Sequence, residues 1–290
     1  MKSVLITGPN GFLGQNLIKK LSSSEIAPIL YEDDICDRIK FVDFINKYKS
    51  IDYCFHFAGL SSVKQCLDNP AEAIKINVTA TNFMAQELIT NFPKIQFVFP
   101  STGQVYAASN AIIDENSNLA PFHFYAETKL KAEENLFKIS QSSGLKTTII
   151  RLFNHTHKSQ STNFFLPSIY QKLKDQAQVI KTGDLSVVRD IGAIQDLMEA
   201  FLNILEKPQS SLFETFNISS GIGKNLRVTV ESLAHTLGQK AIFELDPNFL
   251  RSSEPNSIIA SSIKFQKCFE WTPKHSLNED YLIKNFLKDL

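Results

Sequence analysis

Apolar and polar positions follow two different periods along the first half of the chain. Short segments that are apolar on both faces predict buried parallel strands at 4–6, 26–31, 53–58, 95–99 and 147–152. Between them, apolar residues recur at helical spacing, which predicts helices at 12–21, 37–47, 71–89 and 124–141. Because strands that alternate with helices form βαβ units, this pattern predicts a doubly wound parallel α/β sheet.

The pattern changes after residue 153. Helices are predicted at 164–174, 190–205 and 228–237, strands at 213–218 and 241–245, and the residues that follow are mixed. This half is too interrupted to form a second sheet of the same kind. We therefore expect a Rossmann domain of residues 1–153, to which 190–220 returns, and a smaller mixed α/β lobe of residues 154–189 and 221–290. Such a lobe would cover the carboxyl edge of the sheet, where ligands bind in these folds.

Composition excludes several classes of protein. The 290 residues include 30 Lys and Arg and 30 Asp and Glu, so the chain lacks the basic surplus that nucleic-acid binding requires. Apolar residues make up 43% of the chain and charged residues 21%, which excludes a disordered protein. The length is near the upper limit for a single hydrophobic core, so we expect one large domain or two tightly joined lobes.

The cysteines and the lengths of the apolar segments indicate a compartment. Cys36, Cys54, Cys66 and Cys268 form no CxxC pair and have no His at metal-ligand spacing, so we expect reduced thiols and no metal site. The apolar run at the amino terminus is too short for a signal peptide, and no segment approaches the ~20 apolar residues of a membrane helix. We expect a cytoplasmic protein with no membrane partner.

A glycine-rich segment joins the first strand to the first helix. Residues 7–14, TGPNGFLG, form a TGxxGxxG pattern in the position of a phosphate-binding turn. Glycines here would permit the tight turn, let the backbone approach a pyrophosphate, and let helix and strand pack closely. An ordinary glycine-rich turn is the alternative, but position and spacing both favour a bound dinucleotide. The pattern assigns cofactor binding to the following residues: Gly8, Asn10, Gly11, Phe12, Leu13 and Gly14.

Three acids, Glu32, Asp33 and Asp34, follow the second strand. An acid at this place accepts hydrogen bonds from the ribose of the adenosine, which favours NAD over NADP. A solvated acidic loop is the alternative, and Arg38 or Lys40 would still be able to meet a 2′-phosphate. The expected cofactor is therefore NADP or NAD.

Tyr125 and Lys129 form a YxxxK pair, which a helix places on one face. The pKa of a phenol is near 10, too high for ready proton exchange at neutral pH. A nearby ammonium and a positive nicotinamide favour the phenolate and lower that pKa, so the tyrosine can exchange a proton with a carbonyl oxygen while a hydride moves. Thr102, which follows the fourth strand, would supply a hydroxyl to the same oxygen.

The YxxxK pattern by itself is weak, because Tyr170 and Lys174 match it too. We interpret the second match as a coincidence on a helix surface, since it follows the fifth strand. Thr102 alone is equally consistent with a hydroxyl that satisfies backbone groups at the end of a strand. In combination with the glycine turn, Thr102, Tyr125 and Lys129 form the predicted catalytic set.

These motifs resemble those of the extended short-chain dehydrogenase/reductase family, the NAD-dependent sugar-nucleotide epimerases, dehydratases and reductases, over essentially the whole chain. Residues 56–59, HFAG, match its HxAG motif, residues 151–154, RLFN, match its RxFN motif, and Asn77 matches the Asn of its NV-T segment. The resemblance implies further cofactor contacts for the following residues: Asp34 and Ile35 at the adenine edge, and Phe57, Ala58, Gly59, Asn77, Tyr125, Lys129 and Leu152.

Four further motifs are similar to those of one branch, GDP-mannose 4,6-dehydratase and GDP-4-keto-6-deoxymannose reductase. They are RLFNH with Gln160, GDL with Arg189, DP with Arg251, and WTP at 271–273. Because forked guanidinium groups suit phosphate, Arg189 and Arg251 would clamp the diphosphate, although a single such Arg is more often a surface cation. The resemblance assigns substrate binding to the following residues: Ser61, Val63, Thr102, Gly103, Gln104, Asn154, Arg189, Arg251 and Glu254.

Gly103 and Gln104 separate the two members of this branch. The dehydratases carry a Glu, often after an Asp, in these positions to move the protons that expel water. An amide cannot serve as that acid and base, so hydride transfer alone remains. We expect NAD(P)H, as hydride donor, to reduce the C4 keto group of a nucleotide-linked 4-keto-6-deoxy sugar, GDP-linked, for surface polysaccharide. A 4-epimerase with tightly bound NAD and a non-catalytic dinucleotide sensor are the alternatives.

Two departures from the family concern the substrate and the partners. His157 and Lys158 replace the family's Gly-Pro in a loop that borders the sugar, so a heptose or another nucleotide stays open. His155 and His157 could assist protonation, although exposed loop histidines are usually only solvated. The resemblance also implies a homodimer formed through two helices of each subunit.

Overall fold

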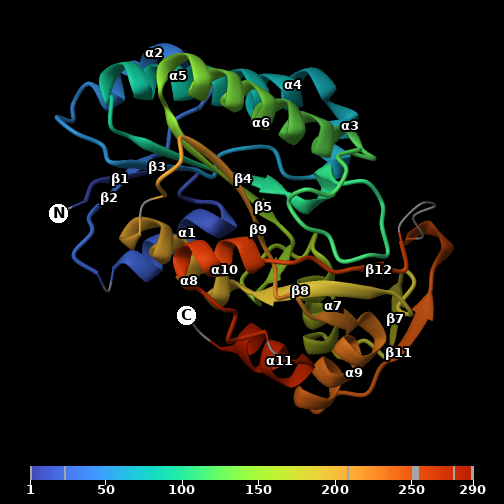
Figure 1. The fold of residues 1–290 in the computed structure, drawn as a ribbon. Helices are drawn as coiled ribbons and strands as arrows, with labels where there is room; N and C mark the ends of the chain where they lie inside the picture. The colour runs from blue at the N-terminus through green and yellow to red at the C-terminus, as the bar shows by residue number, and fades with distance from the viewer. Residues whose placement is uncertain (1, 23, 208, 250–254, 277, 289–290) are drawn as a thin grey trace. The chain divides into compact units, whose positions relative to one another are not determined.

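The computed structural model describes residues 2–22, 24–207, 209–249, 255–276 and 278–288 (Figure 1). Contacts divide the chain into two compact units. Unit 1 comprises Met1–Ala107, Asn118–Leu152 and Ile204–Phe216, and unit 2 comprises Ala108–Ser117, Phe153–Asn203 and Asn217–Leu290. Each unit has a hydrophobic core of its own.

A six-stranded sheet in the order β2-β1-β3-β4-β5-β9 forms the centre of unit 1 (Figure 1). Its strands are β1 (Val4–Thr7), β2 (Pro28–Tyr31), β3 (Tyr53–His56), β4 (Gln96–Thr102), β5 (Lys146–Leu152) and β9 (Phe213–Ile218). Every pairing from β2 to β5 is parallel. The strand order extends from β1 in both directions, so the predicted doubly wound parallel sheet is confirmed.

Helices cover both faces of this sheet. Helices α2 (Arg38–Ile45), α5 (Thr81–Asn91) and α6 (Phe124–Ser143) lie on one face, and α1 (Phe12–Leu21) lies on the other (Figure 1). The core under α2, α5 and α6 includes the fully buried side chains of Leu5, Cys54, Phe97, Phe41, Met84 and Leu136. Two covered faces explain why these strands are apolar on both sides in the sequence.

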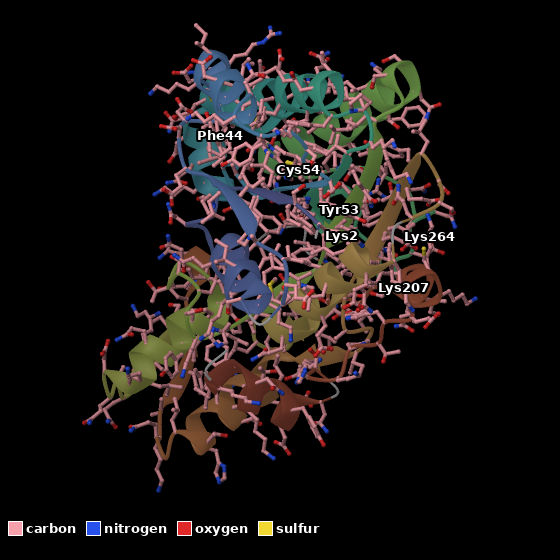
Figure 2. All side chains as sticks on the ribbon, turned by 90° about the vertical axis from the view of Figure 1, so that its left-hand side faces the viewer. Lys2, Phe44, Tyr53, Cys54, Lys207 and Lys264 are labelled. Carbon is pink, nitrogen blue, oxygen red and sulfur yellow. The ribbon has the colours of Figure 1, made fainter. Side chains whose placement is uncertain are left out.

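The amino ends of β1 and β3 are joined by side chains (Figure 2). The ammonium of Lys2 lies 5.6 Å from the ring centroid of Tyr53 and donates a hydrogen bond to the carbonyl of Leu205. Ser3 donates through its N–H (2.7 Å) and its hydroxyl (2.8 Å) to the carboxylate of Asp52. These contacts close the amino ends of the strands. A binding site is therefore expected at the carboxyl ends, on the opposite edge of the sheet.

The predicted helix 71–89 is a series of shorter segments. The structure has α3 (Val63–Asp68), α4 (Pro70–Ile74), a π-helical segment η1 (Lys75–Ala80) and then α5. Helix α3 begins because the side chain of Ser62 accepts a hydrogen bond from the N–H of Gln65. The wider π-helical turn is invisible to a pattern of period 3.6, and such turns often occur at functional sites. A short 3-10 turn, η2 (Gly103–Val105), follows β4.

Unit 2 is built around β8 (Val188–Ala193). Strand β10 (Gly223–Asn225) pairs with β8 antiparallel, and β6 (Asn154–Thr156) and β12 (Ser257–Ile258) pair with it in parallel. Strands β7 (Val179–Thr182) and β11 (Ile242–Leu245) form a separate parallel pair. Helices α7 (Phe165–Lys174), α9 (Leu226–Thr236) and α11 (Glu279–Leu287) contribute Leu173, Leu233 and Phe286 to the core of this unit.

The prediction of one helix over 190–205 is wrong at its start. Strand β8 continues to Ala193, and α8 (Ile194–Glu206) begins only there. Residues 190–194 are all buried, and a continuous buried segment fits a strand and a helix equally well. Pairing with β6 and β10 decides the conformation. The short elements η3 (Pro247–Phe249) and α10 (Ile263–Phe269) lie in the region that the sequence left mixed. No helix among the described residues has the length and apolar character needed to span a bilayer.

Candidate active site

The turn between β1 and α1 has a backbone that only glycine permits at two positions. Gly8 has a φ of +66°, and a Cβ there would lie 2.7 Å from the backbone nitrogen of Ala58 on the neighbouring strand end. A Cβ at Gly14 would lie 2.4 Å from the carbonyl oxygen of Gly8. The N–H of Gly11 donates to that same oxygen at 3.1 Å, which closes the turn at the first turn of α1. The backbone therefore forms a cradle at a helix N-terminus, which favours a phosphate.

A pocket of about 290 Å³ lies at this turn, within unit 1. It brings together eight of the predicted cofactor residues: Gly8, Asn10, Gly11, Glu32, Asp34, Ile35, Ala58 and Gly59. Five further lining residues were not predicted: Pro9, Tyr31, Asp33, Leu60 and Ile76. All five are sequence neighbours of predicted residues, and Ile76 precedes Asn77 in the π-helical segment. Six predicted cofactor residues besides the catalytic pair do not line this pocket: Phe12, Leu13, Gly14, Phe57, Asn77 and Leu152.

Acidic groups dominate the end of the pocket beside β2. Glu32, Asp33 and Asp34 line it. Burial, and after it the charges of the nearby aspartates, raise the pKa of Tyr31 to about 12. Arg38 is already paired, because its Nε and Nη2 donate to one carboxylate oxygen of Glu87 at 2.9 and 2.5 Å. The ammonium of Lys40 lies 3.9 Å from the carboxylate of Asp37.

His56 connects three elements beneath this pocket. Its Nδ1 lies 2.9 Å from the hydroxyl of Thr7, and its Nε2 lies 3.0 Å from the hydroxyl of Thr81. Because the Thr81 hydroxyl donates to the carbonyl of Asn77 (2.9 Å), His56 Nε2 is the donor to Thr81 and Nδ1 accepts from Thr7. The Thr7 oxygen in turn accepts from the N–H of Ala58 at 3.2 Å. A neutral imidazole therefore fixes the strand ends that shape the glycine cradle.

Burial and the charge of Lys129 lower the pKa of His56 to about 3. The unfolded chain, with an ordinary His pKa near 6.5, takes up this proton more readily than the folded protein. We expect the free energy of unfolding to fall as the pH decreases from 6.5 toward 3, by at most about 1.4 kcal/mol per pH unit from this group. Urea denaturation at several pH values measures this slope, and His56→Gln should flatten it. Equal slopes in the two proteins would contradict the assignment of a neutral His56.

Asn77 holds the loop after β3 against α6. Its amide oxygen accepts from the N–H of Leu60 (2.8 Å), and its amide nitrogen donates to the carbonyl of Leu60 and to the hydroxyl of Thr128, both at 3.0 Å. Thr128 precedes Lys129 on α6, and its hydroxyl also donates to the carbonyl of Tyr125 at 2.7 Å. Asn77 lies on the π-helical segment, so this turn positions the loop that lines the pocket. Ser61 and Val63 follow that loop at the start of α3.

Thr102 is the last residue of β4 and is paired in register with Leu152, the last residue of β5. Its side-chain oxygen accepts a hydrogen bond from the N–H of Gln104 (3.2 Å), which starts the turn η2. The amide oxygen of Gln104 is buried and has no hydrogen-bond partner among the described residues. Gly103 and Gln104 therefore stand at the carboxyl ends of the central strands, with an amide acceptor available there.

Helix α6 carries Tyr125 and Lys129. The helix begins because the ring Nδ1 of His123 accepts from the N–H of Ala126 at 3.2 Å, and the rings of His123 and Tyr125 are stacked with centroids 6.0 Å apart. The Lys129 ammonium lies 3.9 Å from the ring centroid of Phe99 on β4, which brings α6 against the strand that ends at Thr102. Within the described chain, neither the Tyr125 hydroxyl nor the Lys129 ammonium has a hydrogen-bond partner.

The acidities of these two groups follow from burial. Burial lowers the pKa of Lys129 to about 7, although Glu133 and Cys66 oppose the shift. Burial also raises the pKa of the Tyr125 phenol, and Cys66 adds to this rise. The sequence predicts a lowered phenol pKa from Lys129 and a nicotinamide cation. In the protein alone the shift is upward, because burial of the phenol disfavours its charged form. The phenol is therefore protonated at neutral pH, the form a proton donor needs.

Tyr170 and Lys174, the second YxxxK match, lie on α7 in unit 2. The Lys174 ammonium is 5.6 Å from the centroid of the Tyr170 ring, which packs edge-on against Phe286 of α11 at 5.5 Å. These contacts give the pair a packing role.

Two of the predicted substrate residues lie on the central strands of unit 2. The Asn154 amide donates to the carbonyl of Asp190 at 3.3 Å, across the pairing of β6 with β8. Arg189 is buried, and its Nη1 donates to the carbonyls of Pro255 (3.1 Å) and Asn256 (3.4 Å). Arg251 and Glu254 lie outside the described residues.

The interpretation of His155 and His157 as exposed loop residues is wrong. His155 donates from Nδ1 to the carbonyl of Phe153 (3.0 Å), and burial lowers its pKa. His157 is only 3% exposed, and its Nε2 donates to the carbonyl of Lys288 at 2.8 Å. The ammonium of Lys158 donates to the carbonyl at 287, also at 2.8 Å. The residues that replace the family's Gly-Pro therefore cap the C-terminus of α11, where cations and donors are favoured.

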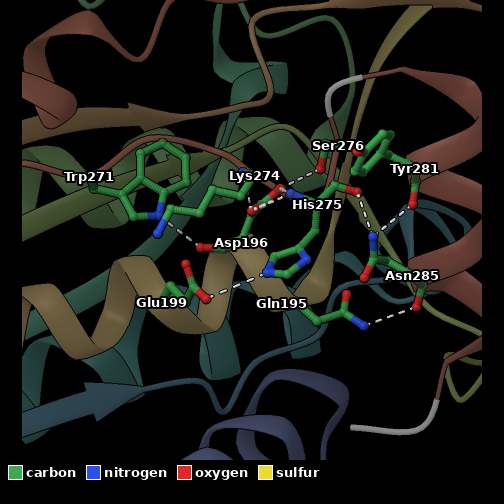
Figure 3. Close-up of polar contacts among 9 residues, drawn as sticks. All are labelled: Gln195, Asp196, Glu199, Trp271, Lys274, His275, Ser276, Tyr281 and Asn285. Atoms are coloured by element: carbon green, nitrogen blue, oxygen red, sulfur yellow. Dashed lines mark hydrogen bonds and ion pairs between the residues drawn. The ribbon is translucent and has the colours of Figure 1, made fainter.

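Figure 3 shows a polar cluster around Asp196 in unit 2. Ligand atoms of Asp196, Glu199 and His275 lie within 4.8 Å of one another. However, Asp196 Oδ1 accepts from the N–H groups of Lys274 (2.7 Å) and His275 (2.9 Å), and Oδ2 accepts from the N–H of His275 (3.1 Å) and the hydroxyl of Ser276 (2.6 Å). Three donors therefore satisfy this carboxylate, with the N–H of His275 shared between its two oxygens, so Asp196 holds residues 274–276 in place.

Residues 4–219 match the sequence model of the NAD dependent epimerase/dehydratase family. The chain belongs to this family. The family resemblance of the motifs is thereby confirmed, and members of this family are NAD(P)-dependent enzymes of the oxidoreductase type.

Two curated relatives cover nearly the whole chain. The GDP-6-deoxy-D-mannose reductase of Pseudomonas aeruginosa is 24% identical over 288 residues, which are 95% of this chain and 93% of that protein. A UDP-glucose 4-epimerase of Halalkalibacterium halodurans is 27% identical over 310 residues, 94% of this chain and 91% of that protein. Family members with both activities are thus similar to this chain.

Solved structures share the fold. The structure of RMD from Pseudomonas aeruginosa complexed with NADPH has a TM-score of 0.89 and 24% identity, and covers 99% of this chain and 98% of that chain. The UDP-glucose 4-epimerase from Brucella ovis in complex with NAD has a TM-score of 0.87 and 20% identity, and covers 98% and 97%.

The residues present in this family member fit a nicotinamide dinucleotide. The cradle at Gly8 and Gly14 has no room for a Cβ, and a pocket follows it toward β2. The Lys129 ammonium is buried and has no acceptor among the described residues, so its N–H groups are available to the hydroxyls of a ligand.

Proposed function

We propose that this protein uses NAD(P)H to reduce the C4 keto group of a nucleotide-linked 4-keto-6-deoxy sugar, GDP-linked, in the synthesis of deoxysugars for surface polysaccharide. Similarity to a GDP-6-deoxy-D-mannose reductase over nearly the whole chain supports this substrate class. In this proposal unit 1 binds the dinucleotide and unit 2 provides the substrate lobe. The proposal includes a cytoplasmic homodimer.

The observation that carries the proposal is the pair Gly103 and Gln104 at the end of β4. A dehydratase needs a carboxylate here to expel water, and neither residue ionises. Among the described groups, no carboxylate shifts the pKa of Tyr125. In this proposal the site provides a proton donor, Tyr125, without the acid and base pair that a dehydratase uses at positions 103 and 104.

Three side chains have roles in the proposed reaction. When bound, the cofactor supplies the hydride. Tyr125 donates the proton of its hydroxyl to the C4 oxygen, and Thr102 orients that oxygen with a hydrogen bond. Lys129 donates to the ribose hydroxyls and lowers the pKa of Tyr125 once the site is filled. In unit 2, Asn154 and Arg189 contact the diphosphate of the substrate in this proposal.

The charges of the pocket favour NADH over NADPH in this proposal. Glu32, Asp33 and Asp34 would repel a 2′-phosphate, and Arg38 is held by Glu87. We expect NADH to bind at least about tenfold more tightly than NADPH, a difference of about 1.4 kcal/mol. Glu87→Gln releases Arg38 and should improve NADPH binding while NADH binding stays constant. Quenching of nicotinamide fluorescence measures both constants, and equal affinities in the wild-type protein would contradict this reading of the pocket.

Cofactor oxidation tests the proposed reaction. NADPH and NADH are supplied separately, with 4-keto-6-deoxy sugars made from GDP-, CDP- and dTDP-hexoses. Stoichiometric oxidation with one of these sugars is expected, and it identifies the base. A sugar isomer formed without net oxidation would overturn the reductase in favour of a 4-epimerase, which the 27% identical relative makes the second candidate. Dinucleotide binding without turnover of any sugar would favour the third possibility, a non-catalytic dinucleotide sensor.

A further inference from the structure

A buried ion pair lies behind Lys129 in unit 1. Glu133 and Arg151 are each about 5% exposed, and the guanidinium of Arg151 contacts both carboxylate oxygens. Nη2 of Arg151 lies 2.7 Å from Glu133 Oε2, and its Nε lies 3.2 Å from each oxygen. Nη1 of Arg151 donates to the hydroxyl of Tyr106 at 2.9 Å. The pair therefore has a fixed geometry.

The position of this pair on α6 relates it to the catalytic set. Tyr125, Lys129 and Glu133 follow one another at intervals of four, so the helix places them along one face. Arg151 extends from β5, one residue before Leu152 at the carboxyl end of that strand. Along this face the Tyr125 hydroxyl comes first, then the Lys129 ammonium and then the Glu133 carboxylate, which binds the guanidinium of Arg151.

The surroundings of Lys129 contain few groups that can balance its charge. His56 faces it from β3 and is neutral, and Cys66 faces it from α3 as a thiol whose pKa is raised by burial. The Phe99 ring lies below the ammonium, and Tyr125 is protonated. Among the described groups that act on Lys129, Glu133 is the one that carries a negative charge at neutral pH.

A buried ion pair is an energetically unfavourable way to join α6 to β5, if packing is its only role. Two charges lose their hydration here, and apolar side chains of similar volume usually stabilise such a contact equally well. The Glu133 carboxylate lies one helical turn from the buried Lys129 ammonium. A negative charge there favours the charged form of Lys129, which an apolar pair would not do.

We propose that Glu133 is a positioning residue that keeps the Lys129 ammonium charged in its buried place, and that Arg151 holds Glu133 ionised and in line with it. The inference rests on the role that the proposed function gives to Lys129. Glu133 is buried and does not line the pocket at the glycine turn, so in this inference it acts through Lys129.

Glu133→Gln tests this inference, because it removes the charge and keeps the shape. The pKa of Lys129 should fall further, so activity that needs the ammonium is lost at a lower pH. We expect the alkaline limb of kcat/KM to move down by at least about one pH unit, and NADH to bind about tenfold more weakly at pH 8. Glu134→Gln is the matched control, since Glu134 is the next residue of α6 and pairs with Lys131 on the exposed face.

Glu133→Gln leaves the guanidinium of Arg151 buried without its partner, which can prevent folding. The double variant with Arg151→Met removes that charge as well. A purely structural role predicts that the double variant regains the wild-type pH profile along with its fold. The inference predicts that the fold returns and the shifted profile stays.

The readouts separate this inference from the proposed function. The pH dependence of NADH binding requires no sugar, so a shift in Glu133→Gln supports the inference even where no sugar is reduced. Wild-type reduction with an unshifted binding profile in Glu133→Gln overturns the inference and leaves the reductase in place. A shift of equal size in Glu134→Gln also overturns it, because the effect would then come from overall charge.

Discussion

Tyr125→Phe is expected to lower kcat by about 10²–10⁴, the usual contribution of a positioned proton donor. The substitution removes the hydroxyl alone. It leaves the ring, which stacks on His123, and the neighbouring Lys129 ammonium over Phe99. Binding of NADH should therefore change little, because Lys129 and the glycine cradle stay in place. Steady-state oxidation of the cofactor with the reducible sugar gives kcat, and nicotinamide fluorescence gives the affinity.

Tyr170→Phe is the matched control for this prediction. Tyr170 belongs to the second YxxxK match and packs against Phe286 in unit 2, so its hydroxyl should be dispensable for turnover. If Tyr125→Phe retained wild-type kcat, the proposed proton donor would be wrong. If the Tyr170 variant lost activity while Tyr125→Phe kept it, the two matches would have to exchange their roles.

Gly14→Ala is expected to weaken dinucleotide binding by at least about 100-fold, or about 2.7 kcal/mol. The added Cβ would lie 2.4 Å from the carbonyl oxygen of Gly8 and 2.7 Å from the Cα of Pro9. Both are backbone atoms that cannot rotate away, so the turn itself must shift. The N–H of Gly11 donates a hydrogen bond to the same carbonyl oxygen, and this hydrogen bond is lost when the turn shifts.

This expectation opposes the intrinsic preference of the helix. Alanine in place of glycine within a helix normally stabilises a protein by roughly 0.5–1 kcal/mol. We expect thermal unfolding of Gly14→Ala to occur at a lower temperature despite that gain. Lys19→Ala, at an exposed position of the same helix, is the control, and its NADH affinity should equal that of the wild type. An unchanged affinity in Gly14→Ala would mean that the turn does not hold the pyrophosphate.

The residues proposed for the cofactor and those proposed for the sugar nucleotide lie in different units. In the proposed function, cofactor binding depends on unit 1, where the glycine turn, the acidic pocket and the face of α6 all lie. Asn154 and Arg189 lie in unit 2, and their variants should raise KM for the sugar nucleotide while the NADH affinity stays constant. A substrate-free binding assay therefore serves as the common control for every variant in unit 1.

Sequence periodicity predicted the parallel sheet and the helices α1, α2 and α6, and the glycine pattern predicted the turn between β1 and α1, because these depend on local spacing. The predicted helix 71–89 was divided by the π-helical segment, which local spacing does not show. A glycine pattern between a strand and a helix fixes the geometry of the turn that joins them. A Tyr and a Lys four residues apart lie on the same face once the helix forms. The boundary at 193, by contrast, depended on the pairing of β8 with strands from distant segments. A buried segment of this length has no period that distinguishes strand from helix.

Only the tertiary structure decided the state of the buried polar groups. His56 lies between two threonine hydroxyls, His157 and Lys158 cap a helix more than a hundred residues later, and Glu133 meets Arg151 across helix and strand. Each of these partners is far away in the chain, and charge, tautomer and pKa are set by neighbours in space. The sequence by itself therefore established the fold class and the family motifs and predicted the residues of the site, while long-range packing determined the protonation of those residues and the contacts of the histidines.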